Sequence, residues 1–401
     1  MGRSRRGLGF FATPLGIVFT TVLVDLISFG IILPLLPLYA KRFGASAVTI
    51  GMLAATYSLA QFLLAPAIGR LSDRIGRRPV ILTALAGTAI ASLTMGLANS
   101  LWILFVARAL DGTSGASYAV GQAYVADITA PEERAKGMGL IGAAFGIGLV
   151  IGPAIGALCA LASPRLPFFV ASTIAATNLL IGLRRLPESR VFGDPRERPG
   201  RSALLRRALA DREVAPLVWV SFVGTFAFVG METTFALFGA ERLGYSLAQV
   251  ALIFVYVGVL SSLVQGGLVR PLVARMGEAR VLRAGLVITA VGLAAIAPVQ
   301  ATWQLLIACV PLALGSGLVF PTLTAIVSRR TGEHEQGGVL GVLASTSGLA
   351  RVVGPLVATA FFQHVSDGAP YLIGGGLFLA CLVLLSGATR RVSVASATKA
   401  G

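Results

Sequence analysis

The chain has 401 residues, of which 56% are hydrophobic and only 12% are charged. Soluble domains carry about 25% charged residues, so this composition excludes an ordinary globular protein and predicts that lipid is the solvent. The formal net charge of +16 could indicate nucleic-acid binding. The basic residues fall in short separated clusters, however, and form no continuous basic face. We therefore expect a lipid bilayer, and no nucleic acid, as the macromolecular surroundings.

The apolar stretches between these clusters are long enough to cross about 30 Å of hydrocarbon. They predict an all-α membrane protein with 12 transmembrane helices in two pseudo-symmetric six-helix bundles. The expected parts are an N-terminal half at 1–187, a cytoplasmic linker at 188–213 and a C-terminal half at 214–401. The predicted spans lie at 14–38, 48–68, 79–98, 101–125, 137–162, 166–187, 214–240, 247–269, 280–299, 302–327, 337–363 and 368–389.

The basic residues predict the orientation of these spans. If the N-terminus is inside, 27 of the 33 Lys and Arg residues lie in inner segments. The positive-inside rule then places both termini in the cytoplasm of a multi-pass protein of the cell (inner) membrane.

The first predicted span places Asp25 about three turns into the hydrocarbon, followed by Phe29. A carboxyl group held away from water keeps its proton more readily, and a proton carrier needs this property. A structural ion pair is the alternative interpretation. Glu232 lies equally deep in the seventh span, and Arg351 in the eleventh is its candidate partner.

The segment GRLSDRIGRRP at 69–79 joins the second and third spans. Gly69 and Gly76 permit tight turns and close helix approach. Asp73 can reach exposed amides at a helix N-terminus and, with the arginines around it, form an ionic latch. A gating role is expected for Gly69, Asp73, Arg74, Gly76, Arg77 and Arg78, and a generic positive loop is the alternative. In the second half, Ala274 stands in the place of Asp73.

The fourth span carries a polar face in an otherwise apolar helix. At 100° per residue, its polar residues fall within an arc of about 80°. Arg108 and Asp111 are three residues apart and can pair, and burying both costs several kcal/mol that a purely structural helix has no reason to bear. The residues of this face are Arg108, Asp111, Gly115, Tyr118 and Gln122.

Small residues recur at three- to four-residue spacing in the fifth span, which contains Gly148 and Gly-Pro at 152–153. Small residues let helices pack closely, and Pro153 can bend the backbone. Ordinary tight packing is the alternative interpretation. A shift of 202 residues places Gly152 and Pro153 on Gly354 and Pro355, which indicates an internal repeat.

Several classes of function are not expected. The chain has no phosphate-binding loop, no clustered metal ligands and no pairing of nucleophile and base, so we expect no enzyme, no metal and no cofactor. Aromatic and polar side chains within the predicted spans could line a substrate path, and ordinary packing is the alternative interpretation. The candidates are Phe29, Tyr57, Gln61, Gly115, Tyr118, Gln122, Phe228, Phe235, Tyr256 and Arg351.

Together, the segments at 25–39, 69–79, 108–116 and 142–156 resemble the drug:proton antiporters of the major facilitator superfamily, in particular tetracycline-efflux transporters. The resemblance runs from about residue 10 to 390. Those transporters have further acidic residues in the third and ninth helices, which this chain lacks. Asp111 and Glu232 are expected to replace them, and tetracycline itself is not assumed as the substrate.

The resemblance implies export of small apolar or cationic compounds in exchange for protons, by alternating access in a monomer. Asp25, Arg108, Asp111 and Glu232 are the expected proton-coupling residues, and the proton gradient is the energy source. The first alternative is a metabolite or lipid facilitator or symporter of the same fold. A non-transporting receptor is the more distant one, and intact gating loops argue against it.

Overall fold

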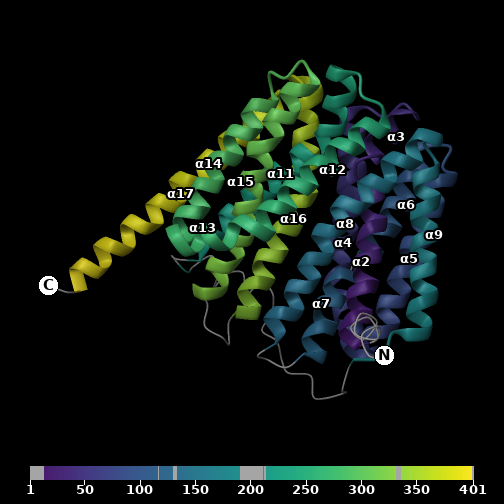
Figure 1. Cartoon of the computed structure of the whole chain (residues 1–401), viewed down its shortest axis with the longest axis horizontal. Coiled ribbons are helices and arrows are strands. Elements are labelled where there is room, and N and C mark those ends of the chain that lie inside the picture. Colours follow the sequence, from purple (N-terminus) through teal and green to yellow (C-terminus); the bar gives the residue numbers. More distant parts are fainter. Residues whose placement is uncertain are drawn as a thin grey trace, which may run out of the picture. The chain divides into compact units, whose positions relative to one another are not determined.

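A computed structural model describes residues 13–115, 117–129, 133–189, 211, 214–330 and 336–399. All regular structure in these ranges is helical, and the helices lie side by side within each part of the chain (Figure 1). The first part of the chain contains α2 (Pro14–Ile32), α3 (Leu36–Lys41), α4 (Ala47–Ile75), α5 (Arg77–Leu97), α6 (Leu101–Ser114), α7 (Ser117–Ile128), α8 (Arg134–Ala162) and α9 (Leu166–Arg185).

The second part of the chain is built in the same manner. Its long helices follow one another with short connections, and one of them continues through a π-helical segment. They are α11 (Ala215–Leu243), α12 (Leu247–Leu263), the π-helix η1 (Val264–Leu268), α13 (Val269–Met276), α14 (Glu278–Ile296), α15 (Thr302–Arg330), α16 (Gln336–His364) and α17 (Ala369–Lys399).

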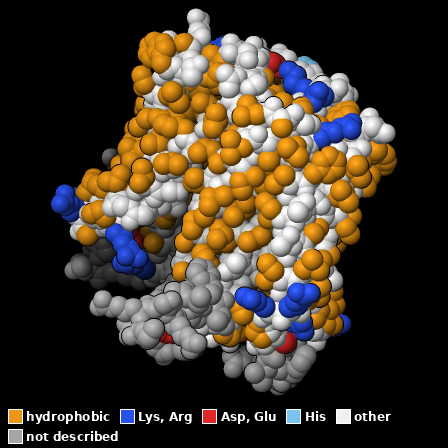
Figure 2. Space-filling model, turned by 45° about the vertical axis from the view of Figure 1, so that its right-hand side comes forward, with side chains coloured by type: hydrophobic (Ala, Val, Ile, Leu, Met, Phe, Trp, Pro, Cys, Tyr) orange, Lys and Arg blue, Asp and Glu red, His pale blue; other side chains and the backbone are white. Residues whose placement is uncertain are grey.

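Ten helices in the described ranges are long and apolar enough to cross a membrane, and they correspond to ten of the twelve predicted spans. The fourth predicted span is divided between α6 and α7, and the twelfth is the apolar part of α17 at Ala369–Leu385. Hydrophobic side chains cover most of the visible surface along the helices, and Lys and Arg side chains lie mainly near the helix ends (Figure 2). The twelve-span plan therefore accounts for the described helices.

The ends predicted for the first two spans were wrong. The first span does not run to residue 38, because α2 ends at Ile32 and a short helix, α3, follows. Pro34 lacks an N–H and its ring would collide with the carbonyl four residues earlier, which breaks the helix there. The second span does not end at residue 68 but continues to Ile75, so Gly69, Asp73 and Arg74 are helical and only Gly76 connects α4 to α5.

The Cα atoms group into two compact units. Residues 47–55 group with the second unit and residues 244–258 with the first, which the predicted division did not include. Within the first unit, α2 packs on α8 and α5 packs on α6 and α9. Within the second, α11 packs on α16 and α14 packs on α15, in keeping with a repeated plan.

Candidate functional site

Arg108 and Asp111 form an ion pair inside the first unit. The Arg108 Nη1 and Asp111 Oδ2 atoms are 2.8 Å apart, and each residue is only 5% exposed. Both lie on α6, three positions apart, so one helical turn places their side chains on the same face, as predicted. Removing two charges from water costs several kcal/mol per ion, which the pairing has to offset.

Tyr57 completes the surroundings of this pair. The Arg108 Cζ atom lies 4.3 Å from the centre of the Tyr57 ring, which gives a cation–π contact on the face of α6 that meets α4. Phe29 of α2 packs against the same ring, with 5.7 Å between ring centres. The Arg108 Nε atom is buried and has no hydrogen-bond partner among the residues that the structure describes. We call Phe29, Tyr57, Arg108 and Asp111 the Arg108 site.

Gln61 fixes the end of α6 beside this site. Its Nε2 atom donates to the Gly115 carbonyl at 2.8 Å. Gly115 has little space for a side chain, because a Cβ there would lie 2.6 Å from the Tyr57 hydroxyl and 2.7 Å from Gln61 Nε2. Phe29, Tyr57, Gln61 and Gly115, which the sequence suggested separately as substrate-path residues, are thus brought together.

The predicted continuous polar face of the fourth span was wrong beyond Gly115. The helix stops at Ser114 and resumes at Ser117, so Gln122 lies on a second helix, where it is half-buried. The side chain of Tyr118 lies outside the described residues. Asp25 is half-buried on α2, and it makes interactions there.

In the second unit, Glu232 is half-buried on α11 and lies within reach of the charge of Arg351, its predicted partner, although the two groups form no direct ion pair. Arg351 is exposed in the described chain, and no ion pair of 4.0 Å or less joins it to Glu232 there. Phe228 packs edge-on against Phe320, 5.6 Å between ring centres, a neighbour that the sequence did not single out. The other predicted aromatic residues, Phe235 and Tyr256, are buried and half-buried respectively.

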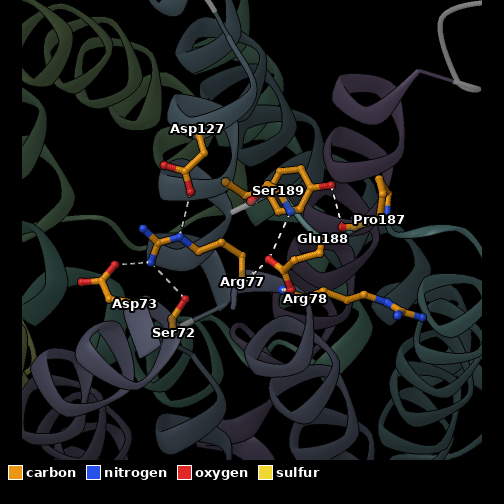
Figure 3. A network of polar contacts seen from close by, with 9 residues as sticks. Ser72, Asp73, Arg77, Arg78, Asp127, Pro187, Glu188 and Ser189 are labelled. Carbon is orange, nitrogen blue, oxygen red and sulfur yellow. Dashed lines mark hydrogen bonds and ion pairs between the residues drawn. The ribbon is translucent and has the colours of Figure 1, made fainter. Parts of the chain in front are cut away.

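A second polar site lies where α4 meets α5. The Arg77 guanidinium, on a residue that is 7% exposed, lies between two carboxylates (Figure 3). Its Nη1 is 2.7 Å from Asp73 Oδ1 and 3.1 Å from the Ser72 hydroxyl, and its Nε is 3.0 Å from Asp127 Oδ2. Arg77 thereby ties the end of α4 and the end of α7 to the start of α5.

Glu188, not Asp73, accepts the exposed amides at a helix N-terminus. The backbone N–H groups of Arg77 and Arg78 donate to its two carboxylate oxygens at 2.8 and 3.1 Å (Figure 3). A carboxylate at this position also offsets the positive end of the α5 dipole. Arg78 donates from Nη2 to the Leu183 carbonyl at 2.8 Å, which holds the end of α9 in place. We call Ser72, Asp73, Arg77, Asp127 and Glu188 the Arg77 cluster.

The sequence reasoning missed Asp127 and Glu188. Glu188 was placed at the start of a solvated linker, where its carboxylate had no expected partner. The local sequence indicated only that the Gly-Arg-Arg helix start has no capping side chain of its own and needs an acceptor from elsewhere. It did not indicate which residue supplies that acceptor. Arg74 is exposed on the last turn of α4, and the structure gives it no contact within the cluster.

The second unit contains a counterpart of the Arg77–Asp127 pair with the charges exchanged. Arg329 Nε is 3.2 Å from Glu278 Oε1, at the start of α14. Positions 278 and 329 lie 201 and 202 residues after Arg77 and Asp127, so the repeat keeps the ion pair and reverses its polarity. Gly277, like Gly76, has a positive φ at this junction, 78° and 103° respectively.

Gly76→Ala is expected to destabilise the α4–α5 junction by about 1–2 kcal/mol, because φ of 103° is unfavourable for any residue with a Cβ. The new Cβ would also collide with the Glu188 carboxylate. Thermal unfolding in detergent measures the effect. Gly69→Ala is the matched control: no atom lies within 4 Å of its Cβ position, contrary to the predicted packing role, so its melting temperature should not fall. Equal losses in both variants would contradict this account.

Glycines allow α2 and α8 to touch along their backbones. A Cβ on Gly152 would lie 2.7 Å from the Gly30 backbone, and one on Gly148 would lie 2.8 Å from the Leu26 Cβ. Gly354 and Gly230 repeat this arrangement between α16 and α11, where a Cβ on Gly354 would lie 2.6 Å from the Phe226 carbonyl oxygen. Pro153 and Pro355 follow directly inside the two helices. The predicted close packing of small residues is therefore present in both units.

Gly152→Ala is expected to separate α2 from α8 and to destabilise the protein by about 1–3 kcal/mol, since overpacking a close backbone contact forces the helices apart. Gly142→Ala on the same helix is the control, because its Cβ would meet no atom within 4 Å. The melting temperatures of the two variants in detergent give the comparison. A Gly152→Ala protein as stable as the Gly142→Ala protein would show that the close contact is not required.

Comparison with known proteins gives a consistent result across the whole chain. The model of the Major Facilitator Superfamily matches residues 18–271 and 267–401. The chain is 35% identical to the class C tetracycline resistance protein of Escherichia coli, over 92% of this chain and 95% of the relative. It is 30% identical to multidrug resistance protein 2 of Bacillus subtilis (strain 168), over 92% and 93% respectively.

Solved structures agree with the sequence relatives. The human organic anion transporter MFSD10 (TETRAN) superposes with a TM-score of 0.71 at 28% identity, covering 92% of this chain and 98% of that one. A POT family transporter superposes with a TM-score of 0.78 at 14% identity, covering 94% and 96%, which shows the fold. The family match, the apolar helices and the repeated packing agree, and the chain is a multi-pass membrane protein that belongs to the Major Facilitator Superfamily.

Proposed function

We propose that this chain exports small apolar or cationic compounds in exchange for protons, by alternating access. The observation that carries the proposal is the buried Arg108–Asp111 pair at 2.8 Å, beside two aromatic rings that can contact an apolar compound. The relatives at 30–35% identity include proteins named for tetracycline resistance and for multidrug resistance, which supports export of such compounds.

The proposed roles divide between the two polar sites. Protonation of Asp111 removes the counter-ion of Arg108, so the guanidinium becomes available to another group, and Asp25 on α2 is the proposed second proton site. Glu232 is the proposed contribution of the second unit. The Arg77 cluster acts as the gate, because it joins the ends of α4, α5 and α7 through one guanidinium.

The remaining features of the proposal follow from orientation and composition. Both termini lie in the cytoplasm, the membrane is the inner (cell) membrane, and the protein works as a monomer. The proton gradient supplies the energy without a bound cofactor, and no bond of the substrate is broken. The Arg77 cluster then lies on the cytoplasmic side of the bilayer.

Transport into everted membrane vesicles tests export directly. Vesicles containing the protein should accumulate ethidium, a lipophilic cation, when respiration acidifies their interior, and nigericin should abolish the accumulation because it collapses the pH gradient. Tetracycline is the second probe. Accumulation of either compound that survives nigericin would favour the alternative, a facilitator without proton coupling, and vesicles containing Asp25→Asn serve as the matched control.

A further inference from the structure

A cavity of about 390 Å³ opens at the end of the first unit that lies opposite the Arg77 cluster. Its six lining residues come from α3 and the residues that follow it, and from the connection between α8 and α9. They include two arginines and two aromatic rings but no carboxylate. The lining residues are Tyr39, Arg42, Phe43, Ser163, Pro164 and Arg165.

The floor of this cavity is held in place by ring contacts and hydrogen bonds. Tyr39 is 1% exposed, packs 4.5 Å from the Phe168 ring and 5.3 Å from the Phe43 ring between ring centres, and donates its hydroxyl to the Met95 carbonyl. Arg165 donates from Nη2 to the Ala98 carbonyl at 3.3 Å. Burial raises the pKa of the Tyr39 phenol although Arg165 lowers it, so the phenol adds no negative charge.

The two arginines have no carboxylate partner in the described chain. Neither Arg42 nor Arg165 forms an ion pair of 4.0 Å or less there, and both residues are exposed. Each guanidinium carries five N–H donors in a fork that suits the oxygens of a phosphate. In the orientation proposed above, on which this inference rests, the cavity lies on the outer side of the membrane, where basic residues are few, so two in one cavity require a reason.

In the second unit, an arginine at the corresponding end of the helices is neutralised by a carboxylate of the protein itself. There Arg242 Nη2 donates to Asp367 Oδ1 at 2.6 Å, and its Nη1 donates to the Ala297 carbonyl at 2.6 Å. Asp367 lies 202 residues after Arg165, so the repeat has an arginine in the first half where it has the neutralising carboxylate in the second. In the described part of the first unit, no carboxylate takes the place of Asp367 beside these arginines.

The apolar surface beside the cavity indicates where a neutralising charge comes from. Leu161, two residues before Ser163, is 75% exposed, and Leu166, next to Arg165, is 36% exposed. Leu97, next to Ala98, is 61% exposed, and Trp102 at the start of α6 is 74% exposed. Acyl chains cover such side chains, and a tryptophan is typical of the level of the lipid headgroups. We propose that this cavity binds a phosphate group carried by an anionic lipid of the outer leaflet.

Native mass spectrometry of the full chain in detergent tests the proposal. The protein should retain phosphatidylglycerol in preference to phosphatidylcholine. Arg42→Gln should weaken retention about fivefold, and Arg42→Gln with Arg165→Gln about 25-fold, since each basic residue near an anionic surface contributes ~1 kcal/mol. Lys41→Gln is the matched control, because Lys41 is an adjacent base that does not line the cavity. Its retention should equal that of the unchanged protein.

Two further measurements separate lipid binding from misfolding and from binding of free phosphate. The melting temperature of Arg42→Gln should match the unchanged protein, because its side chain holds no backbone carbonyl, unlike that of Arg165. Soluble glycerol phosphate and inorganic phosphate should raise the melting temperature less than phosphatidylglycerol does. Equal retention of the two lipids, or equal losses in Lys41→Gln and Arg42→Gln, would overturn the site. Stabilisation by soluble phosphate alone would overturn the lipid as its source.

Discussion

Asp111→Ala is expected to destabilise the protein by about 3–5 kcal/mol and to abolish export, because Arg108 then stays buried without a counter-ion. The pair is 2.8 Å apart, and both residues are 5% exposed, so water cannot replace the lost carboxylate without opening the packing of α6. Thermal unfolding in detergent measures the first effect and vesicle transport the second.

A double variant separates the structural role of this pair from its proposed role in transport. Arg108→Met with Asp111→Leu replaces both charges with apolar side chains of similar size, which is often neutral for stability. We expect a melting temperature close to that of the unchanged protein together with no export. Export at the unchanged rate from this variant would show that the pair serves folding only.

Arg77→Ala is expected to cost about 2–4 kcal/mol and to reduce export strongly, because one guanidinium neutralises both Asp73 and Asp127. Arg77→Lys should recover little of the loss, because an ammonium group cannot match the fork that contacts two carboxylates and the Ser72 hydroxyl. Melting temperature and ethidium transport measure the two effects, and an Arg77→Lys protein with full activity would contradict the geometric argument.

The repeat suggests a rescue for this site. The second unit has Ala274, Glu278 and Arg329 where the first has Asp73, Arg77 and Asp127. Arg77→Glu alone places three carboxylates together and should lose export. Adding Asp73→Ala and Asp127→Arg to Arg77→Glu copies the second-unit arrangement and should raise the melting temperature above that of the single variant. Failure of this triple variant to regain stability would mean that the two junctions are not equivalent.

Features that depend on local spacing could be predicted from the sequence. Arg108 and Asp111 are three positions apart, so one turn of helix pairs them wherever the helix lies. Likewise, the offset of 202 residues between Gly152 and Gly354 predicted equivalent helix contacts in the two units, which are those of α8 with α2 and of α16 with α11. The extents of most apolar spans followed from length and hydropathy alone.

Features that depend on distant partners could not be predicted. Glu188 caps α5 from a position 111 residues further along the chain, and no periodicity relates them. Asp127 and Arg77 lie 50 residues apart in the chain, and no sequence pattern relates these two positions either. That Arg351 is exposed and forms no direct ion pair with Glu232 could not be predicted, since membership of an apolar span does not state which way a long side chain points. Pro34 could have predicted the end of the first helix, but the apolar residues on both sides of it favoured one continuous span.

The most direct test of proton-coupled export is a proton measurement in proteoliposomes without any imposed pH gradient. With ethidium concentrated inside and a pH-sensitive dye trapped in the lumen, the protein should acidify the lumen as ethidium leaves, because each exported molecule is exchanged for protons. Asp25→Asn should abolish the acidification. Release of ethidium with no change in luminal pH, or full acidification by Asp25→Asn, would contradict the account.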